Sequence, residues 1–262
     1  MINVRTQILG SNLDCLTLSQ TLNRIEDIIQ KGQPTQHVVI NANKINLMHQ
    51  DTKLRDIVNA SPLINADGSS IVLAGKLLGQ PIPERVTGID LFEELLDICN
   101  EKEYRPYFLG ATQEVIEEIE AHYRAKYPDM SFGGFRNGYF SPEESVSIAD
   151  EIRESDSDIL FLAFSSPQKE YWASEYLERL DVPFVMGVGG TFDVIAGKTN
   201  RAPQWMQRAG LEWFYRFVQE PRRMFSRYFF GNLRFLNHVK QEKIKLWKEN
   251  RFVGRSQDER NY

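Results

Sequence analysis

The chain has few residues of the kinds that cross-link a small protein or span a bilayer. Its 262 residues include two cysteines, Cys15 and Cys99, too few for a disulfide scaffold or a cysteine-rich metal site. Its longest uncharged apolar run is far too short to cross a bilayer, and the first ten residues lack the apolar stretch of a signal peptide. It contains no internal repeat and no linker rich in Ser, Gly or Pro. We therefore expect a globular protein of the reducing cytoplasm.

Basic residues are scarce in the first 200 residues, and acidic residues are scarce in the segment that follows. Residues 1–200 contain 30 acidic but only 17 basic residues, whereas residues 201–251 contain 12 basic and only 4 acidic residues. Such an asymmetry predicts an anionic partner for the basic segment: a membrane surface, a phosphate group or a nucleic acid. An acidic body does not favour a nucleic-acid-binding protein.

Through residue 200, short apolar runs alternate with amphipathic stretches. Strands are predicted at 37–41, 62–66, 105–110, 158–164 and 182–188, with a weaker one at 130–135. Helices are predicted at 18–31, 43–59, 70–78, 89–103, 113–126, 142–154 and 168–179. Buried runs alternating with helices are typical of βαβ units. The fold class is therefore α/β, with a mostly parallel sheet and flanking helices whose strand order is left open.

After about residue 200 the pattern changes. No further strand is predicted, and helices are expected at 211–219 and from 221 to about 247, where aromatic and basic residues interleave. A solvated helix face is the ordinary interpretation of such a stretch, but the density of Phe, Tyr and Trp favours an anionic membrane surface. We therefore divide the chain into a core at 1–200 and a helical, basic, membrane-associating appendage at 201–262.

Small, amide and carboxylate residues follow every strong strand. In open parallel sheets, ligands bind beyond the carboxyl ends of the strands, so these residues are expected to converge on one site. They are Asn41, Asn43, Asp67, Gly110, Gln168, Gly187, Gly189, Gly190 and Asp193.

Each of these motifs also has a plain structural interpretation. The turn 187–193 could hold a phosphate on backbone N–H groups or could simply be tight. Asp67 could be a general base on a hydroxyl, although a helix cap is favoured on spacing alone. Arg85 could clamp a diphosphate or form a surface ion pair. The D-x-D at 156–158 precedes a strand and lies at the wrong edge of the sheet, and the four histidines have no metal-ligand spacing.

Longer motifs occur in a specific order along the chain. They are ADG at 66–68, PERVTGID at 83–90, SPQKE at 166–170, GVGGTFD at 187–193, RAPQWM at 201–206 and GLEWFYRFVQEPRR at 210–223. Together they closely resemble the WecG/TagA/CpsF family, glycosyltransferase family 26, over about residues 5–240.

The resemblance implies an inverting glycosyltransferase with a Rossmann-like core. Such an enzyme moves a sugar from a UDP-sugar to a polyprenyl-diphosphate-linked sugar at the inner face of the cytoplasmic membrane, for a capsule, exopolysaccharide or teichoic acid-like polymer. It implies a peripheral membrane protein and a homo-oligomer, with no metal and no other cofactor. No nucleic-acid partner is expected.

The resemblance also assigns roles, residue by residue. Asp67 matches the proposed general base, which reverses the preference for a cap. The positions that match substrate-binding residues are Asn41, Asn43, Arg85, Gln168, Arg216, Arg222 and Arg223. The positions that match the nucleotide pocket are Gly110, Tyr139, Gly187, Gly189, Gly190 and Asp193.

Two departures concern the expected sugar pocket. Asn41 stands where the family often has Thr, and Ser69 and Ser70 replace the usual glycine pattern. Both favour a donor other than UDP-N-acetylmannosamine and the capsule or exopolysaccharide branch. A non-catalytic, membrane-docked subunit that binds nucleotide sugars is the alternative. A Rossmann oxidoreductase or epimerase is disfavoured, because the first strands lack its early G-x-G-x-x-G turn.

Overall fold

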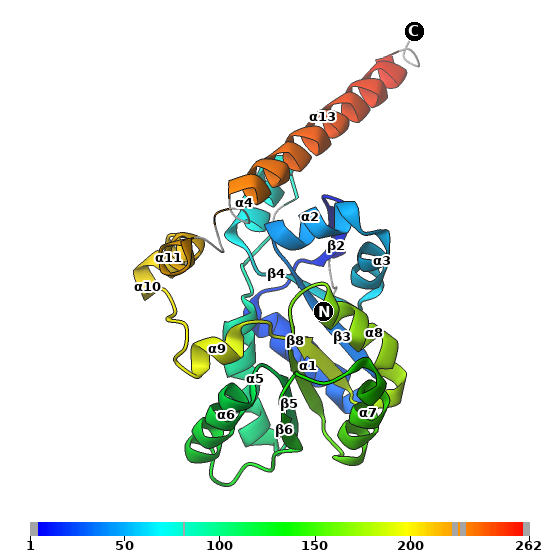
Figure 1. The fold of residues 1–262 in the computed structure, drawn as a ribbon. Helices are drawn as coiled ribbons and strands as arrows, with labels where there is room; N and C mark the ends of the chain where they lie inside the picture. Colours follow the sequence, from blue (N-terminus) through cyan, green and yellow to red (C-terminus); the bar gives the residue numbers. More distant parts are fainter. Residues whose placement is uncertain (1–4, 81, 222–224, 226–228, 259–262) are drawn as a thin grey trace.

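The computed structural model describes residues 5–80, 82–221, 225 and 229–258, with side chains described as far as residue 249. Its centre is a six-stranded, fully parallel sheet in the order β4-β3-β8-β7-β5-β6 (Figure 1). The strands are β3 (Thr35–Ile40), β4 (Leu63–Ala66), β5 (Pro106–Gly110), β6 (Gly134–Arg136), β7 (Ile159–Ala163) and β8 (Phe184–Gly187). The carboxyl ends of all six therefore share one edge.

Helices connect the strands and continue after β8. Those of the core are α1 (Leu18–Lys31), α2 (Ala42–Gln50), α3 (Thr52–Ala60), α4 (Ser69–Leu78), α5 (Gly88–Lys102), α6 (Gln113–Lys126), α7 (Ser145–Glu154), preceded by a 3-10 turn at Pro142–Glu144, and α8 (Gln168–Leu180). After the last strand come α9 (Thr191–Ile195), α10 (Gln204–Arg208), α11 (Glu212–Gln219) and α13 (Gly231–Asp258).

Three clusters of buried apolar side chains cover the sheet. On one face, α1, α5 and α6 pack on the strands around Phe92 and Phe108. On the other face, α7 and α8 pack around Leu160 and Trp172, and α2, α3 and α4 cover β3 and β4. Consecutive residues of a strand enter opposite clusters, as Phe108 and Leu109 of β5 do. The sheet is thus buried on both faces, which explains its continuous apolar strands.

The helix α13 is partly docked on the core and partly projects from it (Figure 1). Phe235 and Val239 are buried in the cluster shared with α2 and α4. The backbone N–H of Leu9 donates to Glu242 at 3.0 Å, and the Asn46 amide donates to the carbonyl of Gly231 at 2.8 Å. The helix therefore packs against the core through its first turns.

The α/β class, the predicted strands and most predicted helices are confirmed within a few residues. One predicted helix, 43–59, is instead two helices, because Asp51 ends α2 and its side chain accepts the Leu54 N–H as the cap of α3.

A hairpin at the start of the described chain was not predicted. It joins β1 (Arg5–Ile8) and β2 (Ser11–Asp14) through Leu9 and Gly10, both with positive φ. Asp14 attaches it to the core by accepting the Ile64 N–H of β4 at 2.8 Å, and within the hairpin the same carboxylate binds Arg5 at 2.7 Å.

Candidate active site

Asp67 lies directly beyond β4 and is held by two donors. The N–H of Gly88, at the start of α5, donates to Oδ1 at 3.3 Å, and the Asn41 amide lies 3.5 Å from Oδ2. Asn41 also caps α2 by accepting the Lys44 N–H at 3.0 Å. The Asp67 side chain is only half-buried, so a substrate hydroxyl can approach it. Asp67 accepts an N–H from the first residue of α5 but does not cap α4, which has no side-chain cap. A half-buried carboxylate in this position has the chemistry of a general base.

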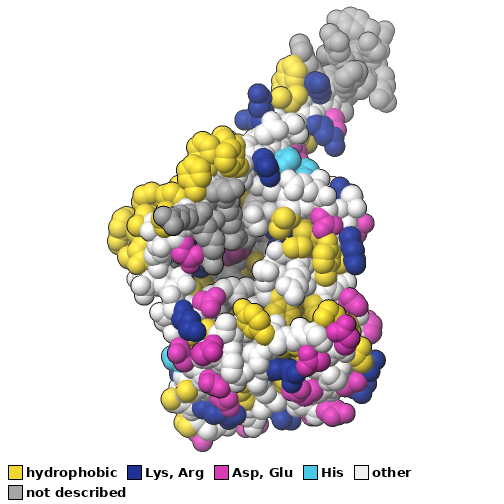
Figure 2. Space-filling view, in the orientation of Figure 1, with side chains coloured by type: hydrophobic (Ala, Val, Ile, Leu, Met, Phe, Trp, Pro, Cys, Tyr) yellow, Lys and Arg dark blue, Asp and Glu magenta, His cyan; other side chains and the backbone are white. Residues whose placement is uncertain are grey.

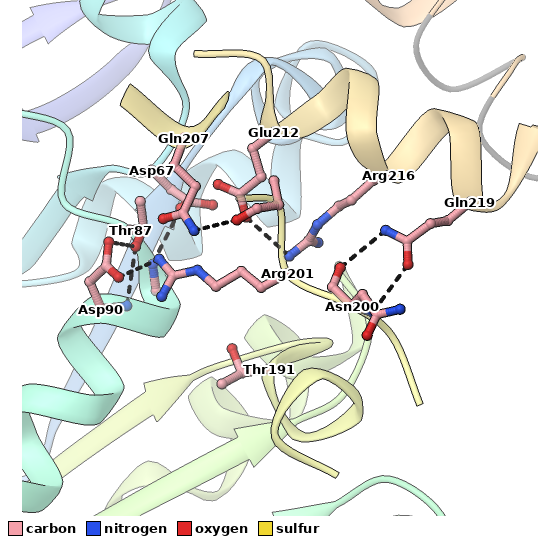
Figure 3. A network of polar contacts seen from close by, with 12 residues as sticks. Asp67, Thr87, Asp90, Thr191, Asn200, Arg201, Gln207, Glu212, Arg216 and Gln219 are labelled. Carbon is pink, nitrogen blue, oxygen red and sulfur yellow. Dashed lines mark hydrogen bonds and ion pairs between the residues drawn. The ribbon is translucent and has the colours of Figure 1, made fainter. Parts of the chain in front are cut away.

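Ion pairs tie the segment after residue 200 to the loop that precedes α5. Glu212 lies 3.6 Å from both Arg85 and Arg216, so one carboxylate is shared between two guanidinium groups. Arg201 pairs with Asp90, which also accepts a hydrogen bond from Thr87 (Figure 3). Asn200 and Gln219 are joined by two further hydrogen bonds. These contacts hold α11 beside the Asp67 edge and gather several cations there.

The glycine turn after β8 allows a lysine to reach the centre of the sheet edge. A Cβ on Gly187 would lie 2.8 Å from Cδ of Lys169, so a larger residue there would displace the Lys169 side chain from this position. The Lys169 ammonium lies 3.5 Å from the Gly187 carbonyl. Gly189 has a φ of 57°, a conformation that glycine adopts without strain. The turn therefore places backbone groups and an ammonium at the middle of the edge.

A buried ion pair fixes this part of the site. Lys44 of α2 and Glu170 of α8 are both almost fully buried and form an ion pair, and Ser166 donates to the same carboxylate at 3.1 Å. Burial alone would raise the pKa of Glu170, but the charges of Lys44 and Lys169 outweigh it and the pKa is lowered. Because a buried charge without its partner is strongly destabilising, the pair couples α2 to α8 at the site.

Two loops meet at the β5–β6 end of the edge. The Gly138 N–H donates to the carbonyl of Ala111 at 2.9 Å, and a Cβ on Gly110 would lie 2.8 Å from Cβ of Ala163. The side chain of Tyr139, in the same loop, is 76% exposed. An exposed aromatic ring beside tightly packed glycine backbone can stack on a flat ligand.

Comparison with known proteins identifies the family. Residues 6–249 match the profile of the glycosyl transferase WecG/TagA/CpsF family. The chain belongs to this family. It is 34% identical over 180 residues, 68% of this chain and 69% of the relative, to an N-acetylglucosaminyldiphosphoundecaprenol N-acetyl-beta-D-mannosaminyltransferase of Bacillus spizizenii. A protein of the same name from Staphylococcus aureus strain MW2 is 28% identical over 222 residues, 84% of this chain and 87% of the relative.

The WecG/TagA/CpsF motifs fall at the edge just described. Of the residues expected to bind substrate, Asn41 contacts Asp67, and Arg85 and Arg216 share Glu212. Asn43 is half-buried in the first turn of α2. Arg222 and Arg223 lie outside the described residues.

The expected nucleotide positions lie along the same edge. Gly187, Gly189 and Gly190 form the turn after β8, with Asp193 in the short helix that follows. Gly110 and Tyr139 lie at the β5–β6 end, as described above.

Several charged residues of the described site were not among those expected: Lys44, Asp90, Lys169, Glu170, Arg201 and Glu212. Gln168, which was expected, is exposed at the start of α8, whereas the next residue, Lys169, reaches the glycine turn. The SPQKE motif contains both residues, but nothing in the sequence indicated that Lys169 reaches the glycine turn.

The described residues include neither a membrane-spanning helix nor a cluster of metal ligands. No helix among them is long and apolar enough to cross a membrane. Nor do three or more His, Cys, Asp or Glu side chains gather there as ligands of a metal ion would.

Proposed function

We propose that this glycosyltransferase moves a sugar from a UDP-sugar to a sugar linked to a polyprenyl diphosphate. The observation that carries the proposal is the place of Asp67, half-buried at the carboxyl edge and beside Asn41 and Gly88. The names of the relatives support the acceptor class, since they give N-acetylglucosaminyldiphosphoundecaprenol as the acceptor. The product would serve the synthesis of a bacterial cell-surface polysaccharide.

The proposed reaction is a single displacement with inversion. The Asp67 carboxylate accepts the proton of the acceptor hydroxyl while the hydroxyl oxygen forms a bond to the anomeric carbon. The bond between that carbon and the UDP oxygen breaks, and UDP leaves with the electron pair. Positive charge is needed where this oxygen becomes negative. Arg85 and Arg216 can supply it without a metal ion.

The donor would lie across the middle of the edge. Its diphosphate would lie against the turn of Gly187, Gly189 and Gly190 and meet the backbone N–H of Gly190, and its uracil would stack on Tyr139 and hydrogen-bond to Asp193. Asn43 and Gln168 would contact the sugars. These assignments place the leaving UDP between the glycine turn and the appendage, where Arg222 and Arg223 are also proposed to act.

Membrane association follows from the acceptor and from the surface of the appendage. Large apolar side chains are exposed on the face where α10, α11 and the start of α13 lie (Figure 2). They are Trp205, Trp213, Phe214, Val218, Phe225, Phe229, Phe230, Leu233 and Leu236. With the basic residues of 201–251, this surface suits the inner face of a cytoplasmic membrane. A homo-oligomer is also proposed.

A UDP-release assay tests the function. We expect acceptor-dependent release of UDP from one donor of a UDP-sugar panel, unchanged by EDTA, with a short polyprenyl-diphosphate-linked N-acetylglucosamine as acceptor. UDP-N-acetylmannosamine is the first donor to try, because the relatives are N-acetylmannosaminyltransferases. Asp67→Asn should lower kcat at least about a hundredfold, as expected for loss of a general base.

The matched control is Asp129→Asn, an exposed carboxylate in the loop after α6, which should keep normal turnover. Near-normal turnover of folded Asp67→Asn would overturn the assignment of the base. UDP binding without release from any donor would support the non-catalytic alternative.

A further inference from the structure

A groove of about 1020 Å³ lies between α4, the residues Gly79, Ile82, Glu84, Arg85 and Asp90, and α10. Its α4 wall is formed by Ser69, Val72, Leu73 and Lys76, which recur at helical spacing and so share one face of the helix. The opposite wall is formed by α10, including Arg208. The glycine turn after β8 and Tyr139 do not line this groove, whereas Arg85 does, so the groove adjoins the proposed donor pocket at Arg85 and extends away from it.

One end of the groove lies beside the proposed base. Ser69, which lines it, is two residues from Asp67. The chain that follows α10 packs on this end, since a Cβ on Gly210 would lie 3.1 Å from Oγ of Ser69. From Ser69 to Lys76 the helix rises roughly 10 Å. The groove can therefore hold the acceptor's first sugar and the diphosphate that follows it.

Two of the groove's cations form no ion pair with any acidic residue that the structure describes, although Glu84 and Asp90 also line the groove. Of its four basic residues, Arg201 pairs with Asp90 and Arg85 pairs with Glu212. Lys76 and Arg208 are exposed, and neither forms an ion pair within the described chain. Two such cations in one groove match a diphosphate, whose oxygens accept charge-assisted hydrogen bonds.

Apolar side chains lie beside these cations. Leu73 and Leu77, one turn apart on α4, are 58% and 47% exposed, and Val72 and Ile82 line the groove with Leu73. Trp205 of α10 is also exposed and belongs to the apolar surface seen in Figure 2. Anionic and apolar ligand parts would thus find matching surfaces next to each other.

We propose that this groove binds the lipid-linked acceptor, with Lys76 and Arg208 on its diphosphate and Leu73 and Leu77 against its first isoprene units. This inference rests on the proposed function, because it takes the acceptor class from there. The acceptor sugar then lies over the first turn of α4 and presents its hydroxyl to Asp67. The polyprenyl chain leaves the groove towards the apolar surface of the appendage.

Binding of farnesyl diphosphate tests the groove without any need for turnover. We expect the wild-type protein to bind it. Lys76→Glu and Arg208→Glu should each weaken binding about tenfold, which is roughly the affinity that one charge-assisted hydrogen bond contributes. Leu73→Ser should weaken the binding of farnesyl diphosphate but leave the binding of inorganic diphosphate unchanged. No binding by the wild type, or equal binding by the charge variants, would overturn the proposal.

Lys102→Glu is the matched control. Lys102, like Lys76, is an exposed lysine in the last turn of a helix, where a cation favours the helix dipole. Both substitutions should lower the melting temperature by a similar small amount, but only Lys76→Glu should weaken binding. If Lys102→Glu weakens binding equally, the effect of Lys76→Glu comes from the change in the protein's net charge, and the groove is not the binding site.

Kinetics separate this inference from the proposed function. In the UDP-release assay, Lys76→Glu and Arg208→Glu should raise KM for the acceptor about tenfold and leave KM for the donor unchanged. Transfer by the wild type with unaltered acceptor KM in both variants would refute the groove and keep the function. Farnesyl diphosphate binding in the groove without transfer to any acceptor would refute the function and keep the groove.

Discussion

His37 is a histidine that folding keeps neutral. It is buried in β3, its Nε2 lies 3.0 Å from Oδ1 of Asn65, and its ring stacks on Phe184. Burial lowers its pKa from 6.5 to about 4, and the charges of Lys44 and Lys169 act in the same direction. The unfolded chain therefore takes up a proton at a higher pH than the folded protein does.

Stability should accordingly fall as the solution becomes acidic. The contribution of His37 is complete above pH 6.5 and is lost progressively as the pH falls towards 4. Between pH 7.5 and 5.0 the free energy of unfolding should decrease by about 2 kcal/mol more in the wild type than in His37→Gln. Urea unfolding at the two pH values measures this difference. His122→Gln, at an exposed histidine of α6, should keep the wild-type decrease, and an equal decrease in His37→Gln would contradict the prediction.

Individual site residues could be predicted where the backbone alone places them. Asp67 directly follows β4 and Gly187 is the last residue of β8, and parallel strands bring their carboxyl ends to one edge whatever their order. Lys169 and Glu212 could not be predicted in this way, because their positions depend on packing between segments far apart in sequence. Lys169 reaches the site only because the backbone of Gly187 carries no side chain, and Glu212 only because α11 packs near Arg85.

The secondary-structure elements were predicted best where their amphipathic pattern is long. The helix α1 has the predicted bounds, Leu18–Lys31, and Thr17 and Gly32 cap it. The break at Asp51 was not predicted, since apolar residues at helical spacing continue from α2 into α3 and the cap is a single side chain. The β1–β2 hairpin was missed because its four-residue strands give too short an alternation to recognise.

Docking of α13 depends on few side chains. Phe235 is 4% exposed against the cluster of α2 and α4, whereas its neighbour Leu236 is 58% exposed. Truncating a buried Phe costs roughly 3 kcal/mol of stability. We expect this loss to lower the free energy needed to open α13 locally. In Phe235→Ala we expect the backbone amides of 235–245 to exchange with solvent on the order of a hundredfold faster.

Leu236→Ala is the control for this prediction, because it removes a side chain of similar kind from the exposed side of the same turn. Amide exchange in α13 should be close to that of the wild type, and the strands of the sheet should stay protected in both variants. Equal exchange in Phe235→Ala and Leu236→Ala would show that Phe235 does not hold the helix.

The whole molecule combines an acidic core with a basic end. The division at about residue 200 was visible in the charge counts, and the described structure adds that α11 and α13 are nevertheless tied to the core through Glu212 and Phe235. An appendage anchored in this way would hold the core at a fixed height above a membrane. The groove along α4 would then open towards the apolar surface through which a lipid acceptor must arrive.

Membrane binding should therefore depend on both the apolar and the basic side chains of this face. Trp213 and Phe214 are 44% and 45% exposed on α11. Replacing both by Ser should weaken co-sedimentation with phosphatidylglycerol vesicles roughly tenfold or more, because interfacial binding scales with the apolar area that is buried. Val146→Ser, at an exposed apolar residue of α7 on the core, should leave vesicle binding unchanged.

Wild-type binding should also weaken as salt is raised, since salt screens the attraction between basic side chains and anionic lipid. It should be poor on neutral phosphatidylcholine, which lacks that attraction. Unchanged sedimentation of the double variant would mean that α11 does not face the lipid, and the acceptor would then have to reach Asp67 from another side.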